Sequence, residues 1–278
     1  MPDKIVIYDP DQIHPFQAYR RLEGDFAHLH DLAPSISHFY EAEKLRGVNE
    51  ELRQEVLGCP TARAARKLAK RHETMWRQDW KLVRGAVLRA SLAMQMVQSV
   101  EARQAIRQAA ARAPEIAAAG GRLGGVPAPF FAANLGQVIE QARSRTVNRL
   151  GLLVLKGYEP ADLEARLDAL FTAKRPFSAA VYVGEEASTS AEAWCMRHAI
   201  PLRYIGDHRR RLRSEDHAEI GHRINTLVVC APQTRKAVSL ILEPARQVRT
   251  RVVDLTRPAA QRRDDAVLVR SSSERKAP

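Results

Sequence analysis

The chain has 278 residues, of which 45% are hydrophobic, enough for one large domain or two ordinary ones with a buried core. Its net charge of +12 favours polyanionic partners such as nucleic acid or nucleotides, or else serves only solubility. Cys59, Cys195 and Cys230 have no paired spacing, so we expect buried thiols in a reducing compartment and no disulfide or metal site. With no apolar leader and no membrane-spanning run, we expect a cytoplasmic protein.

The first half of the chain is predicted to be mainly helical. β-Branched residues favour a short strand at 4–8. Apolar residues then recur at helical spacing, Thr61 can cap one helix, and Pro114 marks the end of the longest. The expected helices are 36–45, 49–57, one that begins after Thr61, 76–113, 134–143 and 148–156.

A glycine-rich segment, 120–129, interrupts these helices. Its glycines could cradle a phosphate through backbone N–H groups, or could form a plain loop. Because no strand precedes the segment and the Walker lysine is absent, it is not a nucleotide-binding fingerprint.

Strands alternate with helices after residue 157, which predicts a parallel sheet covered on both faces. The expected strands are 178–183, 202–205, 226–230 and 250–255, and the expected helices are 160–170, 191–198 and 237–246. We therefore expect an α+β protein with a mainly helical domain at 1–157, a small α/β Rossmann-like domain at 158–256, and a disordered basic tail at 257–278.

Four segments of the first half occur in a recognisable order. Residues 37–48 are Ser-His-Phe-Tyr-Glu-Ala-Glu-Lys-Leu-Arg-Gly-Val, and the others lie at 59–67, 77–84 and 148–155. Together they resemble the NADAR superfamily, which includes the YbiA-like N-glycosidases of riboflavin intermediates. The resemblance covers residues 1–157 and implies an N-glycosidase, with no cofactor expected.

In that family a helix carries Glu-His-x-x-Gln-Ala-x-Lys, and the first glutamate is regarded as catalytic. His38 and Lys44 match this pattern here, but the glutamate position holds Ser37. Glu41 lies four residues further on, on the same helical face, and could supply a carboxylate to the same pocket. The alternative is that Glu41 is a solvated residue paired with a neighbouring cation. The candidate catalytic residues are Glu41, Ser37 and His38.

The resemblance also implies a set of substrate-binding residues. Trp80 matches a family tryptophan that lies against the substrate, although its helical spacing from Trp76 equally fits a core residue. Asn148 could bind ribose or cap a helix, and Asp79 stands where a relative has asparagine. Arg63 and Arg66 could hold phosphate or form a solvated basic face. The set is Trp80, Asn148, Lys44, Arg63, Arg66 and Asp79.

Residues 181–194 have the layout strand, turn, helix and resemble the SLOG-type Rossmannoid domains related to YpsA. The resemblance suggests Gly184, Ser188 and Thr234 as nucleotide-binding positions. Glu185 and Glu186 replace the glycine-rich turn and would repel phosphate, so a docking or assembly module is the alternative.

Two functions follow from these features. The first is hydrolysis of an N-glycosidic bond in an ADP-ribose-like, nucleotide-derived or ADP-ribosylated nucleobase substrate. The second is a catalytically silent protein that binds ADP-ribose or nucleic acid, or that serves as a structural or assembly protein, for instance of a phage. No membrane partner is expected, and an oligomer is compatible with either function.

Overall fold

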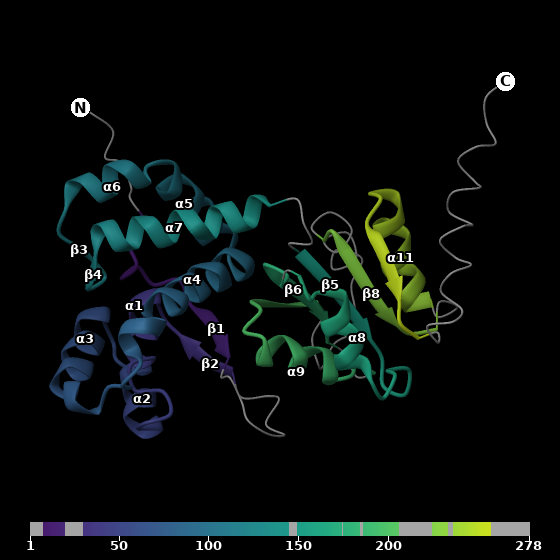
Figure 1. The fold of residues 1–278 in the computed structure, drawn as a ribbon, viewed down its shortest axis with the longest axis horizontal. Helices are drawn as coiled ribbons and strands as arrows, with labels where there is room; N and C mark the ends of the chain where they lie inside the picture. The colour runs from purple at the N-terminus through teal and green to yellow at the C-terminus, as the bar shows by residue number, and fades with distance from the viewer. Residues whose placement is uncertain are drawn as a thin grey trace. The chain divides into compact units, whose positions relative to one another are not determined.

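The computed structural model of the chain describes residues 8–19, 30–144, 149–173, 175–183, 186–205, 224–232 and 236–256. The chain divides into two compact units, one formed by Met1–Arg145 with Met196–Leu202 and one by Thr146–Cys195 with Arg203–Pro278. Figure 1 shows helices dominating the first unit and a sheet in the second; this sheet has five strands. The mixture of helices with a parallel sheet is the one that an α+β class predicts.

The first unit begins with β1 (Phe16–Tyr19) and β2 (His30–Ala33), which pair antiparallel. The helices that follow are α1 (Ile36–Ala42), α2 (Glu50–Leu57), α3 (Ala62–Arg71), a 3-10 turn (Glu73–Met75), α4 (Trp80–Gln98), α5 (Val100–Ala111) and α6 (Ala113–Ala119). A small hairpin of β3 (Arg122–Leu123) and β4 (Val126–Pro127) then leads into α7 (Ala128–Arg143).

Three helix starts follow directly from capping residues in the sequence. Ser35, Asn49 and Thr61 each accept a hydrogen bond from a backbone N–H in the first turn of α1, α2 and α3. Such side chains satisfy donors that a helix leaves without an internal partner. The expected helices at 36–45, at 49–57 and after Thr61 are therefore confirmed, with small differences at their ends.

The single long helix expected at 76–113 is wrong. The chain breaks at Ser99, which ends α4 and whose hydroxyl accepts from the Ala102 N–H at 3.1 Å to begin α5. Pro114 lies in the first turn of α6, where its missing N–H costs nothing, rather than at the end of a helix. The hydrophobic period continues through the break, so periodicity alone does not reveal it.

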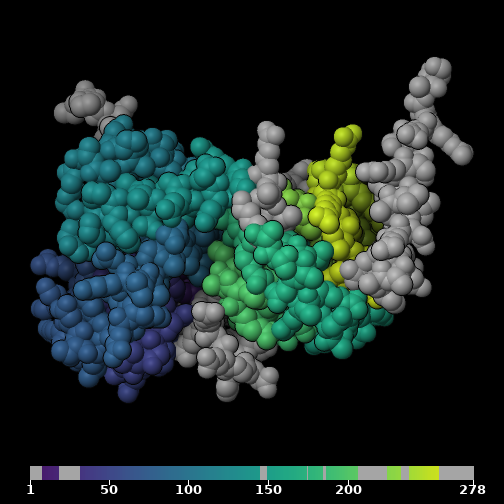
Figure 2. Space-filling model, viewed as in Figure 1, coloured from purple at the N-terminus to yellow at the C-terminus, as the bar shows by residue number. Residues whose placement is uncertain are grey.

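The first unit is centred on α1, all of whose residues are buried. This helix packs against α2, α3 and α4, while α7 packs against α4, α5 and α6. The segment before α1 is held by two α4 side chains: Gln98 pairs with the backbone N–H and carbonyl of Gln17, and Gln95 donates to the His14 carbonyl at 2.7 Å. Figure 2 shows the blue and teal parts of this unit packed closely together.

The second unit is built on β5 (Arg149–Val154), β6 (Ser178–Tyr182), β7 (Leu202–Ile205), β8 (Thr226–Cys230) and β9 (Arg251–Asp254). The strand order is β7-β6-β5-β8-β9, and β5 pairs in parallel with both β6 and β8. The helices are α8 (Leu163–Leu170), α9 (Ser190–Arg197) and α11 (Lys236–Gln247). The four strands and three helices expected beyond residue 157 are thus confirmed.

The expected helix at 148–156 is wrong, because this segment forms the central strand of the sheet. Residues 150–154 are a continuous apolar run, and β5 is buried on both faces, which is typical of an inner parallel strand. Since β5 belongs to the second unit, the two units divide near residue 145 and not near 158.

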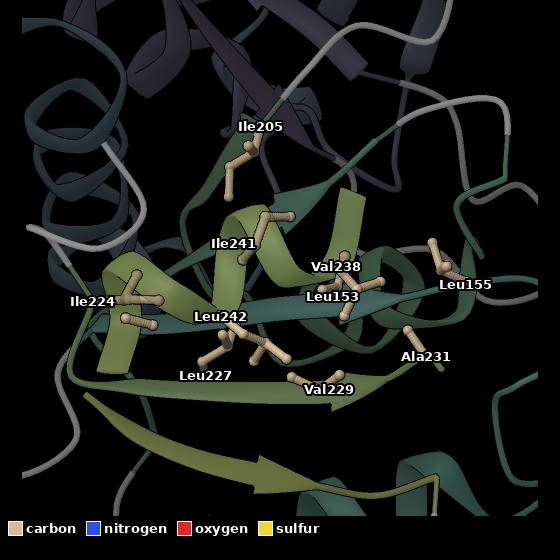
Figure 3. Packing of buried hydrophobic residues seen from close by; sticks show 11 residues of the cluster. Leu153, Leu155, Ile205, Ile224, Leu227, Val229, Ala231, Val238, Ile241 and Leu242 are labelled. Carbon is tan, nitrogen blue, oxygen red and sulfur yellow. The ribbon is translucent and has the colours of Figure 1, made fainter. Parts of the chain in front are cut away.

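The core of the second unit lies between the sheet and α11. Alternate residues of β5 and β8 point to the same face of the sheet and meet an apolar stripe of α11 (Figure 3). The cluster consists of Leu153, Leu155, Ile205, Ile224, Leu227, Val229, Ala231, Val238, Ile241, Leu242 and Ala245. Away from this cluster, Trp194 of α9 is fully buried, contacts Phe171 and donates to Asp168 at 3.1 Å.

Within the described residues, no helix combines the length and the apolar character needed to cross a membrane. The strand expected at 4–8 falls almost entirely outside the described residues, as does the tail expected at 257–278.

Candidate functional site

Three expected site residues, Ser37, His38 and Glu41, lie on α1 and are buried. A buried polar side chain needs a hydrogen-bond partner inside the protein. The partner of each residue therefore determines what chemistry is left to it.

Both ring nitrogens of His38 are bonded within the protein. Nε2 lies 3.1 Å from the Cys59 carbonyl, which can only accept, so this nitrogen carries the proton. Nδ1 lies 2.7 Å from the Ser35 hydroxyl and accepts from it. Burial lowers the pKa of His38, which keeps the ring neutral. His38 therefore fastens α1 to the segment before α3, and its nitrogens are not directed at a substrate.

Ser37 donates its hydroxyl to a carboxylate that the sequence analysis did not identify, that of Asp11. Arg66 of α3 donates to the same carboxylate through two nitrogens, at 2.7 Å to Oδ1 and 2.8 Å to Oδ2. Burial opposes ionisation of Asp11, but the hydrogen bonds from Arg66 and Ser37 outweigh it and lower the pKa of the carboxyl. An ionised carboxylate therefore lies beside position 37, although the sequence has serine there.

Glu41 forms an ion pair with Lys44, whose Nζ lies 2.6 Å from Oε2. Burial raises the pKa of Glu41, against the opposing charges of Lys44, Arg66 and Arg122. The alternative of a solvated Glu41 is therefore wrong, because this carboxyl is buried. The expected pairing with a neighbouring cation is present.

Trp80 lies against other side chains of the unit. Its ring centroid is 4.9 Å from that of Tyr40 in an edge-to-face contact, and Lys44 Nζ lies 5.8 Å from it. The same ammonium group lies closer to the Trp76 ring, at 4.1 Å. Only 8% of Trp80 is exposed, so the packing interpretation describes it better than an open stacking surface.

The turn of the β3–β4 hairpin lies directly against these polar groups. Gly124 and Gly125 both have positive φ, 55° and 78°. A Cβ at Gly124 would be 2.5 Å from Ser37 Oγ, and one at Gly125 would be 2.7 Å from Arg66 Cδ and 3.6 Å from Glu41 Oε1. The expected glycine-rich loop is thus a short hairpin whose backbone covers Ser37, Glu41 and Arg66 as closely as only glycine allows.

Further cations surround this cluster. Arg122 donates to the Gly125 carbonyl at 2.6 and 3.0 Å, and its charge partly opposes the rise that burial produces in the pKa of Glu41 and of Tyr40. Arg84 is exposed, stacks on the Phe130 ring at 4.8 Å and also favours ionisation of Tyr40. Neither arginine was among the expected site residues, since only spatial proximity connects them to α1.

Two expected substrate-binding residues lie outside this group of contacts. Asp79 accepts from Arg77 at 2.5 and 2.8 Å, an ion pair between near neighbours in the chain. Arg63 is exposed on α3, three residues before Arg66. Asn148 lies outside the described residues, and the Leu150-Gly151 pair that follows it belongs to β5 of the second unit.

In the second unit, Gly184 and Thr234 lie outside the described residues. Ser188 is described and is buried. Its hydroxyl accepts from the Ser190 N–H at 3.1 Å, so it stabilises the turn that leads into α9. Its backbone N–H donates to the Val154 carbonyl, and Lys156 N–H donates to the Glu186 carbonyl, both at 2.9 Å. The segment after β6 therefore continues the pairing of β5 at its carboxyl end.

Within the described part of the chain, no group of three or more His, Cys, Asp or Glu side chains could hold a metal ion. No family model, curated protein or solved structure matches the chain. Any function assigned to the cluster around Asp11 and Glu41 therefore rests on its own residues and geometry.

Proposed function

We propose that the first unit is an N-glycosidase-type hydrolase of the NADAR kind. Its substrate would be an ADP-ribose-like or nucleotide-derived molecule or an ADP-ribosylated nucleobase. The observation that supports this proposal is the environment of Glu41, a buried carboxyl bonded to Lys44 and close to Arg66 and Arg122. Such a group places acid–base chemistry beside positive charge, which suits a substrate that carries both a glycosidic bond and phosphate.

The chemistry requires those groups in combination. Cleavage of an N-glycosidic bond develops positive charge on the ribose, and the departing base must gain a proton. A carboxyl whose pKa is raised by burial can donate that proton nearer to neutral pH than a solvated one. The exposed Arg122, which is close to Glu41, can pair with the phosphates of the same substrate.

The test compares Glu41→Gln with the wild type. Both proteins are incubated with an oligonucleotide that carries ADP-ribosylated guanosine and with riboflavin intermediates, and released base or ribose is quantified. We expect the wild type to release product and the variant to do so about 10²–10⁴-fold more slowly. Glu115→Gln, which alters an exposed partner of Arg112 elsewhere in the unit, should match the wild type. Equal rates for Glu41→Gln and the wild type would remove Glu41 from the mechanism.

A second candidate is a catalytically silent protein that binds a polyanion, and α3 favours it. This helix contains five cations and no acid: Arg63, Arg66, Lys67, Lys70 and Arg71. Arg63, Lys67 and Lys70 are exposed and recur at helical spacing, so they form one basic face. A continuous basic face is suited to the phosphates of a nucleic acid strand.

The two candidates give different results in binding experiments. A silent binder would gain thermal stability with ADP-ribose but release no product. It would shift duplex DNA in a gel at about 50 mM salt and lose affinity steeply by about 200 mM. Replacing Arg63, Lys67 and Lys70 with glutamine should lower the salt dependence of DNA binding if the protein is a silent binder. If it is a hydrolase, the same changes should leave turnover of a small substrate intact.

For the second unit we propose a Rossmannoid module that senses nucleotide or docks to a partner. The strand order reverses between β5 and β8, and open α/β sheets bind ligands at the carboxyl ends of the strands beside such a reversal. The carboxyl end of β5 is bonded to Glu186 and Ser188, which favours docking over nucleotide binding. Equilibrium dialysis with ATP and with ADP-ribose distinguishes the two roles.

A further inference from the structure

Asp11 lies against the face of α1 that carries Ser37 and Glu41. Ser37, which bonds Asp11, and Glu41 are four residues apart and therefore lie one helical turn from each other. Arg66 connects the two carboxyl groups, because it bonds Asp11 directly and is near enough to Glu41 for each to influence the pKa of the other. Gly124 and Gly125 cover both positions without side chains.

The surroundings of the two carboxyl groups differ in kind. Asp11 is held by a two-nitrogen pair with Arg66 and by a hydroxyl, and 32% of its side chain is exposed. Glu41 has 4% of its side chain exposed and a single ammonium partner, Lys44. The pKa of Asp11 is therefore lowered and that of Glu41 is raised. Two neighbouring carboxyls whose pKa values move apart suit one ionised and one protonated role.

We propose that Asp11 is the carboxylate that stabilises the ribosyl cation in the hydrolysis proposed above, and that Glu41 donates the proton to the departing base. Ser37 and Arg66 are positioning residues that act through Asp11. This inference rests on the proposed function of the first unit, and it assigns the two roles to two residues of this chain.

The reaction balances with water as the only co-reactant. The bond between the ribosyl carbon and the base nitrogen breaks, its electron pair leaves with the nitrogen, and that nitrogen takes the proton of the Glu41 carboxyl. Water then forms the new bond to the ribosyl carbon, and its released proton returns to Glu41. Asp11 remains ionised throughout and lowers the energy of the positive charge on the sugar.

The first measurement is turnover of ADP-ribosylated guanosine by Asp11→Asn, Asp11→Glu and the control Glu115→Gln. We expect Asp11→Asn to lower kcat about 10²–10³-fold with little change in KM, because the lost charge acts mainly on the transition state. Asp11→Glu should retain more activity because it keeps the charge. Circular dichroism and melting curves establish that each variant is folded.

The second measurement does not need turnover. Each protein is titrated with ADP-ribose and with an analogue in which a protonated pyrrolidine replaces the ribose ring. We expect the wild type to prefer the cationic analogue, and Asp11→Asn to lose that preference by at least about tenfold. Ser37→Ala should shift the acid limb of the pH profile for kcat/KM to higher pH, because one hydrogen bond to the Asp11 carboxylate is lost.

The outcomes separate this inference from the function on which it rests. Turnover and a preference for the cation that both survive in Asp11→Asn would overturn the role of Asp11 and leave the hydrolase proposal standing. A wild type that releases no base but prefers the cation through Asp11 would refute hydrolysis while supporting the placement of this carboxylate. Loss of both properties in the wild type itself would overturn both.

Discussion

The two units differ in what they bury at their centres. The second unit buries an apolar sheet: β5 and β8 are enclosed, and their alternate residues pack on α11. The first unit buries a polar helix, in which Ser37, His38 and Glu41 each rely on a specific partner. An apolar centre depends on filled volume, whereas a polar centre depends on each hydrogen bond being made. A buried polar group that loses its partner lowers the free energy of unfolding, but only polar groups can take part in acid–base chemistry.

The largest expected effect tests the apolar centre. Leu227 of β8 is 1% exposed and lies in the cluster on α11, so Leu227→Ala leaves a cavity. We expect it to lower the free energy of unfolding by about 2–5 kcal/mol, measured by urea denaturation. Leu240→Ala is the matched control, because Leu240 of α11 is 44% exposed and its truncation should cost less than about 0.5 kcal/mol. Similar losses for the two variants would contradict the assigned core.

The next effect tests the covering of the polar centre by the β3–β4 turn. Gly124 and Gly121 both have positive φ, but a Cβ meets Ser37 and Pro10 at Gly124 and meets nothing within 4 Å at Gly121. Alanine should strain the backbone at either position, and at Gly124 it should also force Ser37 or Pro10 to move. We expect Gly124→Ala to be the less stable variant by about 1–3 kcal/mol in thermal and urea unfolding. If Gly121→Ala is as unstable as Gly124→Ala, Gly124 does not pack closely against α1.

The smallest effect concerns pH. Burial holds the pKa of His38 below its ordinary value of 6.5, so the folded state disfavours the protonated ring. The stabilisation from neutral His38 is present above pH 6.5 and is lost as pH falls through the folded pKa, by at most about 1.4 kcal/mol per pH unit. His38→Gln should remove this part of the pH dependence while it lowers stability at neutral pH. Unfolding free energies measured between pH 7.5 and about 5 for both proteins provide the check, and parallel curves would contradict it.

Local signals predicted most of the secondary structure. The cap at Thr61 and the strand–helix alternation beyond residue 157 needed only neighbouring residues. The break at Ser99 and the strand β5 were missed, because an apolar run or period fits more than one structure until tertiary contacts select among them. The hairpin of β1 and β2 was not expected either.

The candidate site was predicted in part, for a different reason. Ser37, Glu41 and Lys44 share one short stretch of sequence, so their proximity on α1 could be inferred. Asp11 lies 26 residues from Ser37 and 55 from Arg66, and no sequence pattern links residues so far apart. Asp11, which follows Pro10, gave no signal of its own, and Arg122 lies in a segment that was considered only for its glycines.

The position of β5 has a consequence for how the second unit folds during synthesis of the chain. It is the first strand of the sheet to be synthesised, yet it lies between two later strands, with β6 on one side and β8 on the other. A nascent chain that has emerged only as far as β7 can assemble β5, β6 and β7 but leaves one side of β5 open to other strands. Synthesis of β8, some twenty residues later, closes that edge. Until then this largely apolar strand can pair with the wrong neighbour.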